Sequence, residues 1–445
     1  MRQLDVLNRF RHIHWLLAAA LLLPIESSAL TLEQSLLAAI NHNPTVHEQY
    51  ARYRSVLSSR EEVDSGYLPQ ISLRAAVGPE HTDQRAGFDV DEQLTREELS
   101  LEITQLLFDG FETTANSQRL SFEAEAERQQ LLAITENLAL QVTAVYLDTR
   151  KAQALLELSE RHVADHEKIL EDIIGLTEKG FANDADIAQV SARLSNARAS
   201  QVAAENNYLD VSVQFFQVVG SRPDRLTDPV SDVSLMPPDI DTALAWARES
   251  HPELRAALAD INAAREEVRA SRSGYYPKLS IEGIANRNDN IGGIEGVDED
   301  YRVQLVLEYD LFNGGRDSSR TEASSWRYNE AMEIRRNTEL ELVSGTNFAW
   351  NAHQALNRQQ ALLREAVDAS SLAEAGYTTQ FKLGKRSLLD LLNAKVEVFI
   401  ARQRYLNTRY DADQAAYRLL NATGRLGYAL RLQYPSEWSQ EQVND

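Results

Sequence analysis

The sequence contains two copies of one pattern, and no other feature constrains the fold as strongly. Gly-Tyr-Leu-Pro at residues 66–69 recurs as Gly-Tyr-Tyr-Pro at 274–277, 208 residues later. Leu-Phe-Asp-Gly at 107–110 recurs as Leu-Phe-Asn-Gly at 311–314, 204 residues later. Landmarks in fixed order at a nearly constant offset indicate a fold built from two similar units. Because the offset changes between the two motifs, the sequence predicts a loop of variable length there.

The repeat divides the chain into segments. We expect a signal peptide over residues 1–29, a first repeat over 30–220, a proline-rich linker over 221–238, a second repeat over 239–424 and a C-terminal tail over 425–445. Each repeat is predicted to contain a helix, a β-hairpin and a long helix that returns through another helix. The β-hairpins are expected at 69–108 and 277–312, and the helix hairpins at 112–219 and 316–422.

The N-terminus has the pattern of a secretory signal. Three arginines precede an apolar run over residues 15–23, and small residues at 27–29 offer a cleavage site. The run of about 10 residues is shorter than the roughly 20 that a membrane-spanning helix needs. The absence of cysteine excludes disulfides, thiolate metal sites and a lipid-bearing cysteine. The net charge of -22 argues against nucleic acid as a partner.

Alternating apolar and polar residues follow each Gly-Tyr-x-Pro motif and predict β-strands. Ile71, Leu73 and Val77 alternate with polar or small residues in the first copy, as Val303 and Leu305 do in the second. A soluble β-sandwich gives this pattern, and so does a membrane barrel with strands of about 9–11 residues. The polar segments 81–96 and 286–300 are interpreted as exposed loops. Since no other apolar run is long enough for a spanning helix, membrane insertion would require a β-barrel.

The helical part is unusually long. Residues 112 to about 178 contain no proline, nor do residues 316–380, which predicts helices of roughly 100 Å each. Gly180 and Gly384 mark turns before return helices over 184–219 and 387–422, and Gly66 and Gly274 are predicted C-terminal caps of the preceding helices. Such helices must pack laterally against others. Four strands leave two open edges, so we expect several subunits to close one barrel.

These features together resemble the TolC-like outer-membrane factors over nearly the whole mature chain. The resemblance rests on the duplication, on the Gly-Tyr-x-Pro and Phe-Asp/Asn-Gly motifs, and on Gly-Lys-Arg-Ser-Leu-Leu-Asp-Leu-Leu-Asn-Ala at 384–394. The resemblance implies a mainly α-helical fold with a membrane β-barrel part, assembled as a trimeric tunnel. It implies docking on an inner-membrane ABC transporter or proton-driven pump through a periplasmic adaptor (membrane-fusion) protein. Outer-membrane lipid would surround the strands, no cofactor would be needed, and nothing would be chemically converted.

The resemblance also assigns roles at the closed end of the tunnel. Asp186 and Arg386 match a gate pair, and Asp390 matches an acidic ring of three carboxylates, which would attract cations. Phe381 stands where the family can carry a tyrosine, and Asn393 where it can carry a second acidic residue. The alternative is that Asp186 and Asp390 are ordinary residues near helix N-termini, stabilised by the helix dipole.

Three further features have more modest interpretations. The turns at the tips, Gly180-Phe181 and Gly384-Lys385, are expected to face the adaptor. His162 and His166 are spaced like two metal ligands, but no third ligand accompanies them, and we expect no metal site. The tail is expected to pack on the outside of the tunnel. Four tyrosines near strand ends fit either an aromatic girdle or ordinary packing: Tyr275, Tyr276, Tyr301 and Tyr309.

The sequence leaves the exported substrate open. Within the channel hypothesis, type I protein secretion is favoured over small-molecule efflux because the lipid-bearing cysteine of many drug-efflux members is missing. The alternative from another class is a periplasmic coiled-coil structural or adaptor protein with a small soluble β-domain. An enzyme is the least favoured class, since no motif of a phosphate-binding loop or a nucleophile elbow is present.

Overall fold

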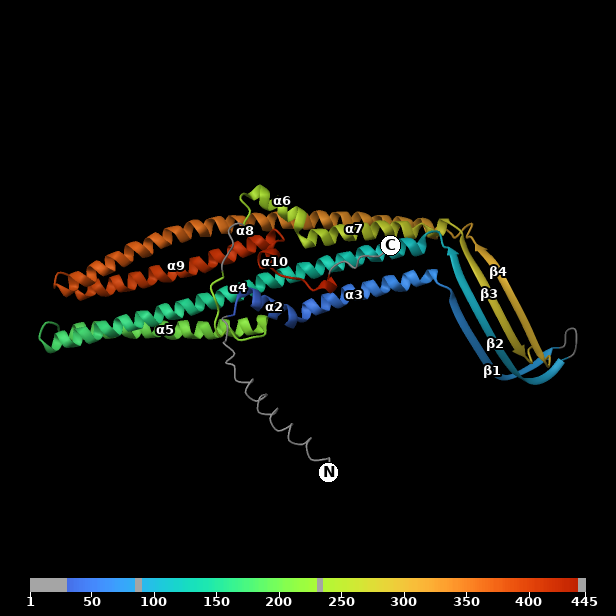
Figure 1. Ribbon diagram of the computed structural model, residues 1–445, viewed down its shortest axis with the longest axis horizontal. Helices are drawn as coiled ribbons and strands as arrows, with labels where there is room; N and C mark the ends of the chain where they lie inside the picture. Colours follow the sequence, from blue (N-terminus) through green and yellow to red (C-terminus); the bar gives the residue numbers. More distant parts are fainter. Residues whose placement is uncertain (1–29, 85–89, 230–234, 439–445) are drawn as a thin grey trace, which may run out of the picture.

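The computed structural model describes residues 30–84, 90–229 and 235–438. The molecule is elongated, with the helices parallel to its long axis, a sheet at one end and the turns of two helix hairpins at the other (Figure 1). The predicted signal peptide, residues 1–29, lies outside the described residues, as does the end of the tail, residues 439–445. None of the described helices is apolar enough over a sufficient length to cross a membrane.

Each repeat opens with two helices joined at a proline. In the first repeat these are α2 (Leu32–His42) and α3 (Pro44–Asp64), and in the second they are α6 (Ile240–Ser250) and α7 (Pro252–Ser271). Each proline occupies the first helical position, where its missing N–H costs nothing. The sequence therefore ends one helix and starts the next with a single residue.

The predicted long helices are confirmed. α4 (Glu112–Glu178) and α8 (Arg316–Lys382) each contain 67 residues. They return through α5 (Asp184–Val219) and α9 (Leu388–Ala422). Helix α4 packs against α5, α7 and α9, so it lies in the interior of the folded subunit. Helix α8 packs mainly against α9 and α7 (Figure 1).

The four strands found in the described residues form one antiparallel sheet in the order β1 (Gln70–Gln84), β2 (Val90–Phe108), β3 (Lys278–Asp289) and β4 (Val297–Glu308). Gln70 pairs with Thr104 in the first hairpin, and Lys278 pairs with Glu308 in the second. The first strands of the two hairpins, β1 and β3, are related by the 208-residue offset, and the returning strands, β2 and β4, by the 204-residue offset. The register therefore places the length change in the loop between the strands, as predicted.

The predicted loops are too long, and this prediction is wrong. Segment 81–96 was expected to be a loop, yet β1 continues to Gln84 and β2 begins at Val90. Segment 286–300 likewise contains the end of β3 and the start of β4. The reason is that backbone hydrogen bonds continue the ladder through polar residues, such as the pair His81–Gln93. The end of the apolar pattern does not end a strand.

The predicted helix caps at Gly66 and Gly274 are also wrong. Both residues lie in short 3-10 turns, Ser65–Tyr67 and Ser273–Tyr275, and neither has a positive φ. At Gly274 a Cβ atom would approach the Asp317 carboxylate to within 2.6 Å. The glycine is required by close packing against the start of α8, and not by a left-handed backbone.

The main core lies at mid-length, where α2, α4, α5 and α9 meet the C-terminal segment. That segment forms α10 (Leu426–Ala429) and a turn at Ser436–Trp438. Trp438 is buried in the core cluster, and its ring lies 6.5 Å from that of Tyr50 on α3. The described part of the tail is therefore an integral element of the fold.

Candidate functional site

The turns at the tips of the two helix hairpins have the same backbone geometry. Gly180 and Gly384 have φ values of 77° and 67°, which favour glycine. Phe181 N–H donates to the Leu176 carbonyl and Lys385 N–H to the Gln380 carbonyl, both at 2.9 Å. These bonds close each long helix in the same way. The predicted turn glycines are thus confirmed, and the tips differ only in their side chains.

The side chains of the turns are free to meet another molecule. The Phe181 side chain is 80% exposed, and Lys385 is exposed at the other tip. A single exposed aromatic residue is common on protein surfaces and does not by itself indicate a partner. The predicted contact of these turns with an adaptor remains a prediction.

Asp186 caps its own helix. Its carboxylate accepts a hydrogen bond from Asn183 N–H at 3.1 Å, and its own N–H donates to the Asn183 side chain at 3.1 Å. This reciprocal pair is a capping box that begins α5. The local role expected for a residue near a helix N-terminus is therefore present, and Asp186 makes no contact with Arg386 within the chain.

Arg386 is held on its own hairpin. Its guanidinium lies 4.4 Å from the centre of the Tyr377 ring and donates to the Gln380 side chain at 3.0 Å. It also lies 3.8 Å from the Asp390 carboxylate, which accepts a hydrogen bond from the Ser387 hydroxyl at 2.9 Å. Both charged groups are about 40% exposed, at 39% and 42%, so solvent weakens this ion pair.

Tyr377 is a residue that sequence comparison with the family did not single out. The resemblance to the TolC-like family implied a tyrosine at the position of Phe381, and Tyr377 lies four residues earlier, on the same face of α8. Phe381 itself packs into an apolar cluster at the tip. The spacing of about one helical turn between Tyr377 and Phe381 is the signal in the sequence that could have identified Tyr377.

Asn393 joins the two hairpins. Its side-chain oxygen accepts a hydrogen bond from Arg193 of α5 at 3.1 Å. The apolar cluster below this contact also spans both hairpins, with buried residues from α4, α5 and α9: Ile169, Ile173, Val190, Leu388 and Leu392. The tips of one chain are therefore packed together.

Lys395 makes a second link, which sequence analysis missed. Its ammonium lies 3.2 Å from Asp165 of α4 and 2.7 Å from Glu374 of α8. Burial alone would lower the pKa of Lys395, but the hydrogen bond to Glu374 and the charge of Asp165 outweigh it and raise that pKa. A single cation thus ties three helices.

The histidine pair lies in the same contact between hairpins. His162 stacks on Phe399 of α9 with ring centres 4.2 Å apart. The centres of the His162 and His166 rings are 4.6 Å apart. His166 is 1% exposed, and neither of its ring nitrogens has a hydrogen-bond partner among the residues that the structure describes. Burial lowers the pKa of His162 to about 4 and also lowers that of His166. Both rings pack as neutral aromatic groups.

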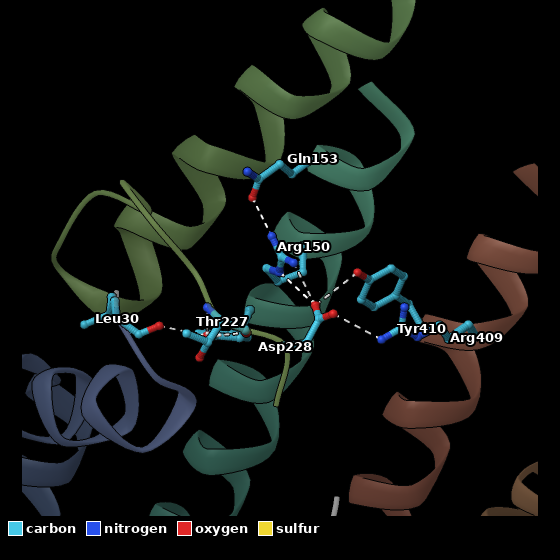
Figure 2. Close-up of polar contacts among 8 residues, drawn as sticks. Leu30, Arg150, Gln153, Thr227, Asp228, Arg409 and Tyr410 are labelled. Carbon is cyan, nitrogen blue, oxygen red and sulfur yellow. Dashed lines mark hydrogen bonds and ion pairs between the residues drawn. The ribbon is translucent and has the colours of Figure 1, made fainter. Parts of the chain in front are cut away.

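The linker between the repeats adds a clamp at mid-length. Asp228 accepts hydrogen bonds from Arg150 of α4 at 2.8 Å and from Arg409 of α9 at 3.2 Å, as Figure 2 shows. The Tyr410 hydroxyl lies 3.4 Å from the same carboxylate. Burial works to raise the pKa of Asp228, but the two arginines prevail and lower it. The proline-rich composition of the linker gave no signal for this contact.

Comparison with known proteins agrees with this architecture. The family model described as outer membrane efflux protein matches residues 36–221 and 244–425. The outer membrane efflux protein BepC of Brucella suis is 27% identical over 400 residues, which cover 89% of this chain and 86% of BepC. The outer membrane protein TolC of Vibrio cholerae is 25% identical over 390 residues, covering 84% and 85%. The structure of the outer-membrane channel OprN matches with a TM-score of 0.73 and 18% identity, over 88% of this chain and 90% of OprN.

Proposed function

Since the chain belongs to the outer membrane efflux protein family, we propose that it is the outer-membrane channel through which an efflux pump expels small toxic molecules. Members of the family are channels with a periplasmic tunnel and are not enzymes, and this protein lies in the outer membrane. They act as trimers with periplasmic adaptors and inner-membrane pumps. Efflux is supported by the description of the family and by the name of the relative BepC, which is an outer membrane efflux protein.

Type I protein secretion is the second candidate. It is supported by the absence of cysteine, since a lipid-bearing cysteine is then impossible. The inner-membrane transporter that copurifies with the tagged protein tests the choice. A proton-driven pump, together with dye accumulation in cells that lack the channel, is the result expected for efflux. An ATP-driven transporter and unchanged dye export would contradict efflux and favour secretion.

The proposal that copies assemble side by side into a channel rests on a difference in burial between residues that occupy equivalent positions in the two repeats. Leu158 on α4 is 4% exposed, whereas its equivalent on α8, Leu362, is 66% exposed. Tyr417 on α9 is 4% exposed, whereas its equivalent on α5, Val213, is 68% exposed. Exposed apolar residues on the two outer helices need a cover. The geometry supports a ring in which α8 of one copy lies against α5 of the next.

The sheet supports the same arrangement. β1 and β4 each have one edge without a partner in the described sheet. Within the chain Leu101 of β2 pairs with Ala285 of β3, and the two offsets convert this pair into Leu305 of β4 with Val77 of the neighbouring copy. The next apolar pair becomes Leu307 with Ala75. We infer this register between copies because a slip by one residue would place the apolar side chains on opposite faces.

Engineered cysteines test this register. Leu307→Cys combined with Ala75→Cys should give covalent trimers on oxidation, because paired strand residues lie within disulfide reach. The chain has no other cysteine, so the background is clean. Leu307→Cys with Ala76→Cys is the matched control, since Ala76 points to the other face. Equal cross-linking in both variants would contradict the register, and failure of both would contradict the closed sheet.

The exposed apolar face of the sheet is proposed to contact outer-membrane lipid. Ile71, Leu73 and Val77 are 68%, 70% and 73% exposed, and Tyr301 and Val303 are 75% and 80% exposed on the same face. Lipid is the environment in which such a face is favourable.

At the tip we propose that Arg386 of one copy meets Asp186 of the next and that three Asp390 side chains form a cation-attracting ring. The support is that both Arg386 and Asp390 are partly exposed and that Asp186 keeps one carboxylate oxygen outside its cap. Replacing Asp186→Asn and Arg386→Gln together should raise single-channel conductance in planar bilayers. Asp184→Asn, an exposed change in the same turn, is the control. Unchanged conductance of the double variant contradicts the gate pair.

A further inference from the structure

The loop that joins β3 to β4 folds over the polar face of the sheet. The N–H of Gly292 donates a hydrogen bond to the carboxylate of Glu80 at 3.1 Å, although Glu80 belongs to β1, on the far side of β2. Val77 lies on the exposed apolar face, so Glu80, three residues later in the same strand, lies on the opposite face. The loop over residues 290–296 therefore crosses β2 on the polar face of the sheet.

A second contact holds the loop in this place. The Asn290 amide donates to the Thr95 carbonyl of β2 at 3.1 Å, and the Asn290 side-chain oxygen accepts a hydrogen bond from Gly296 N–H at 3.1 Å. Asn290 has a φ of 57° and Gly292 a φ of 64°, a left-handed conformation that asparagine and glycine adopt more readily than other residues. The sequence of the loop therefore favours the bend that brings it to Glu80.

Glu80 is itself positioned by a neighbour on the polar face. One of its carboxylate oxygens accepts the Gly292 N–H, and the other accepts a hydrogen bond from Arg96 of β2 at 3.2 Å. The Glu80 side chain is 22% exposed, so water screens these contacts less than it screens an ordinary surface pair. The hydrogen bond that holds the loop is therefore charge-assisted, and its acceptor is fixed before the loop arrives.

The loop lies at the end of the sheet that is farthest from the helices (Figure 1). Members of the family carry their helices in a periplasmic tunnel, so this end of the sheet faces the outside of the cell. We propose that the three loops of the assembled channel narrow its outer mouth and set the size of the molecules that pass, with Glu80 and Asn290 as positioning residues. This inference rests on the barrel proposed above, in which the polar face lines the channel.

Labelling of a cysteine below the loop tests the proposal. Ser100 lies on the polar face of β2, and it is nearer to the helices than Arg96. Ser100→Cys provides the single thiol of the chain. Intact cells are treated from outside with maleimides of increasing size, and the labelled fraction of the tagged protein is measured after purification.

Two further changes, each added to Ser100→Cys, release the loop. Glu80→Ala removes the acceptor for the Gly292 N–H, and Asn290→Asp removes the donor to the Thr95 carbonyl while it tolerates the left-handed backbone. Glu98→Ala is the matched control. It removes a carboxylate from the same face, and among the described residues Glu98 hydrogen-bonds Arg96 and no residue of the loop.

With the loop in place, labelling should slow steeply as the maleimide becomes larger. Both releasing changes should speed labelling by the larger maleimides roughly tenfold, because a hydrogen bond worth about 1.4 kcal/mol shifts an equilibrium by that factor. Labelling by the smallest maleimide should not change. An unchanged size profile in both variants overturns the proposal, as does an equal rise in Glu98→Ala.

The smallest maleimide separates this failure from failure of the proposed channel. If it labels Ser100→Cys in intact cells, the polar face lines a path that is open to the outside, as the proposal requires. If it does not label this position although the denatured protein reacts, the polar face does not line such a path, and the proposed channel is wrong as well.

Discussion

α4 and α8 are equivalent helices of equal length, yet they differ in what surrounds them. α4 buries 23 of its residues within the chain, whereas α8 buries 5. α4 is surrounded by α3, α5, α7 and α9 of the same copy, while α8 keeps an exposed face with Trp326, Phe348 and Leu372. The duplication therefore supplied one architecture for two tasks. Helices α4 and α9 form the core of the subunit, whereas α5 and α8 present the exposed surfaces through which we propose that the copies assemble.

The largest effect is expected when equivalent residues of the two surfaces are truncated. Leu420 on α9 is 4% exposed and its equivalent Phe216 on α5 is 53% exposed. Leu420→Ala should lower the free energy of unfolding of the subunit by about 2–5 kcal/mol, as for a buried leucine. Phe216→Ala should mainly lower the temperature at which the trimer dissociates on gels. Equal loss of subunit stability in both variants, measured by urea unfolding, would remove the distinction between core and assembly surface.

A smaller effect concerns Glu136 of α4, whose equivalent on α8 is Leu340. The Glu136 carboxylate accepts N–H bonds from Leu426 at 3.1 Å and Gly427 at 2.8 Å. Burial raises its pKa to about 7, since these bonds only partly offset the loss of water. The folded state therefore binds a proton more tightly than the unfolded state, and stability should fall by about 2–3 kcal/mol as pH rises from about 5 to about 8.

Glu136→Gln should remove most of this dependence, because the amide oxygen still accepts a hydrogen bond and does not titrate. Urea midpoints at several pH values provide the measurement. Leu340→Gln at the equivalent position of α8 is the control, and it should leave the pH dependence as it is. A flat profile in the unmodified protein would contradict the burial of a charged carboxylate at this site.

The smallest effect is expected at the linker. Asp228→Asn should cost about 1 kcal/mol, because Arg150 and Arg409 lose a common anion that is 43% exposed. The lowered pKa of Asp228 means that its contribution is present above about pH 4 and is lost as pH falls through the folded pKa. The unmodified protein and the variant should therefore converge in acid. Asp224→Asn, in the same linker, should have no effect on urea unfolding at either pH.

The sequence alone predicted the architecture because its signals are local. The proline at residue 44 and the glycines at residues 180 and 384 mark helix boundaries, and the repeat offset relates the two halves without any knowledge of contacts. The strand ends were not predictable from hydrophobic alternation, since polar residues on a paired strand satisfy the same backbone ladder. Gly66 and Gly274 were misinterpreted because close packing and a left-handed backbone both require glycine.

The contacts at the tip were mostly beyond prediction. Lys395 and Asp165 are 230 residues apart in sequence, and no spacing rule relates them. Asp228 lies in a linker whose prolines indicated only irregular structure. The resemblance assigned Asp186 a gate role, and the alternative was an ordinary acidic residue near a helix N-terminus. Within one chain Asp186 forms a capping box, which the sequence analysis did not predict. The proposed gate and the proposed cover of α8 both need a neighbouring copy, which contacts within one chain cannot reveal.

The accessibility of Leu362 in the assembled protein tests whether copies of the channel meet through α8 and α5. Leu362→Cys and Phe181→Cys are each introduced singly, and the rate of modification by a soluble maleimide is measured in outer-membrane vesicles and after denaturation. In the single chain the two positions are 66% and 80% exposed. We expect Leu362→Cys to be protected in vesicles, because α5 of the neighbouring copy covers it, while Phe181→Cys reacts fast. Equally fast modification of both thiols in vesicles would contradict the assembly of the channel through α8 and α5.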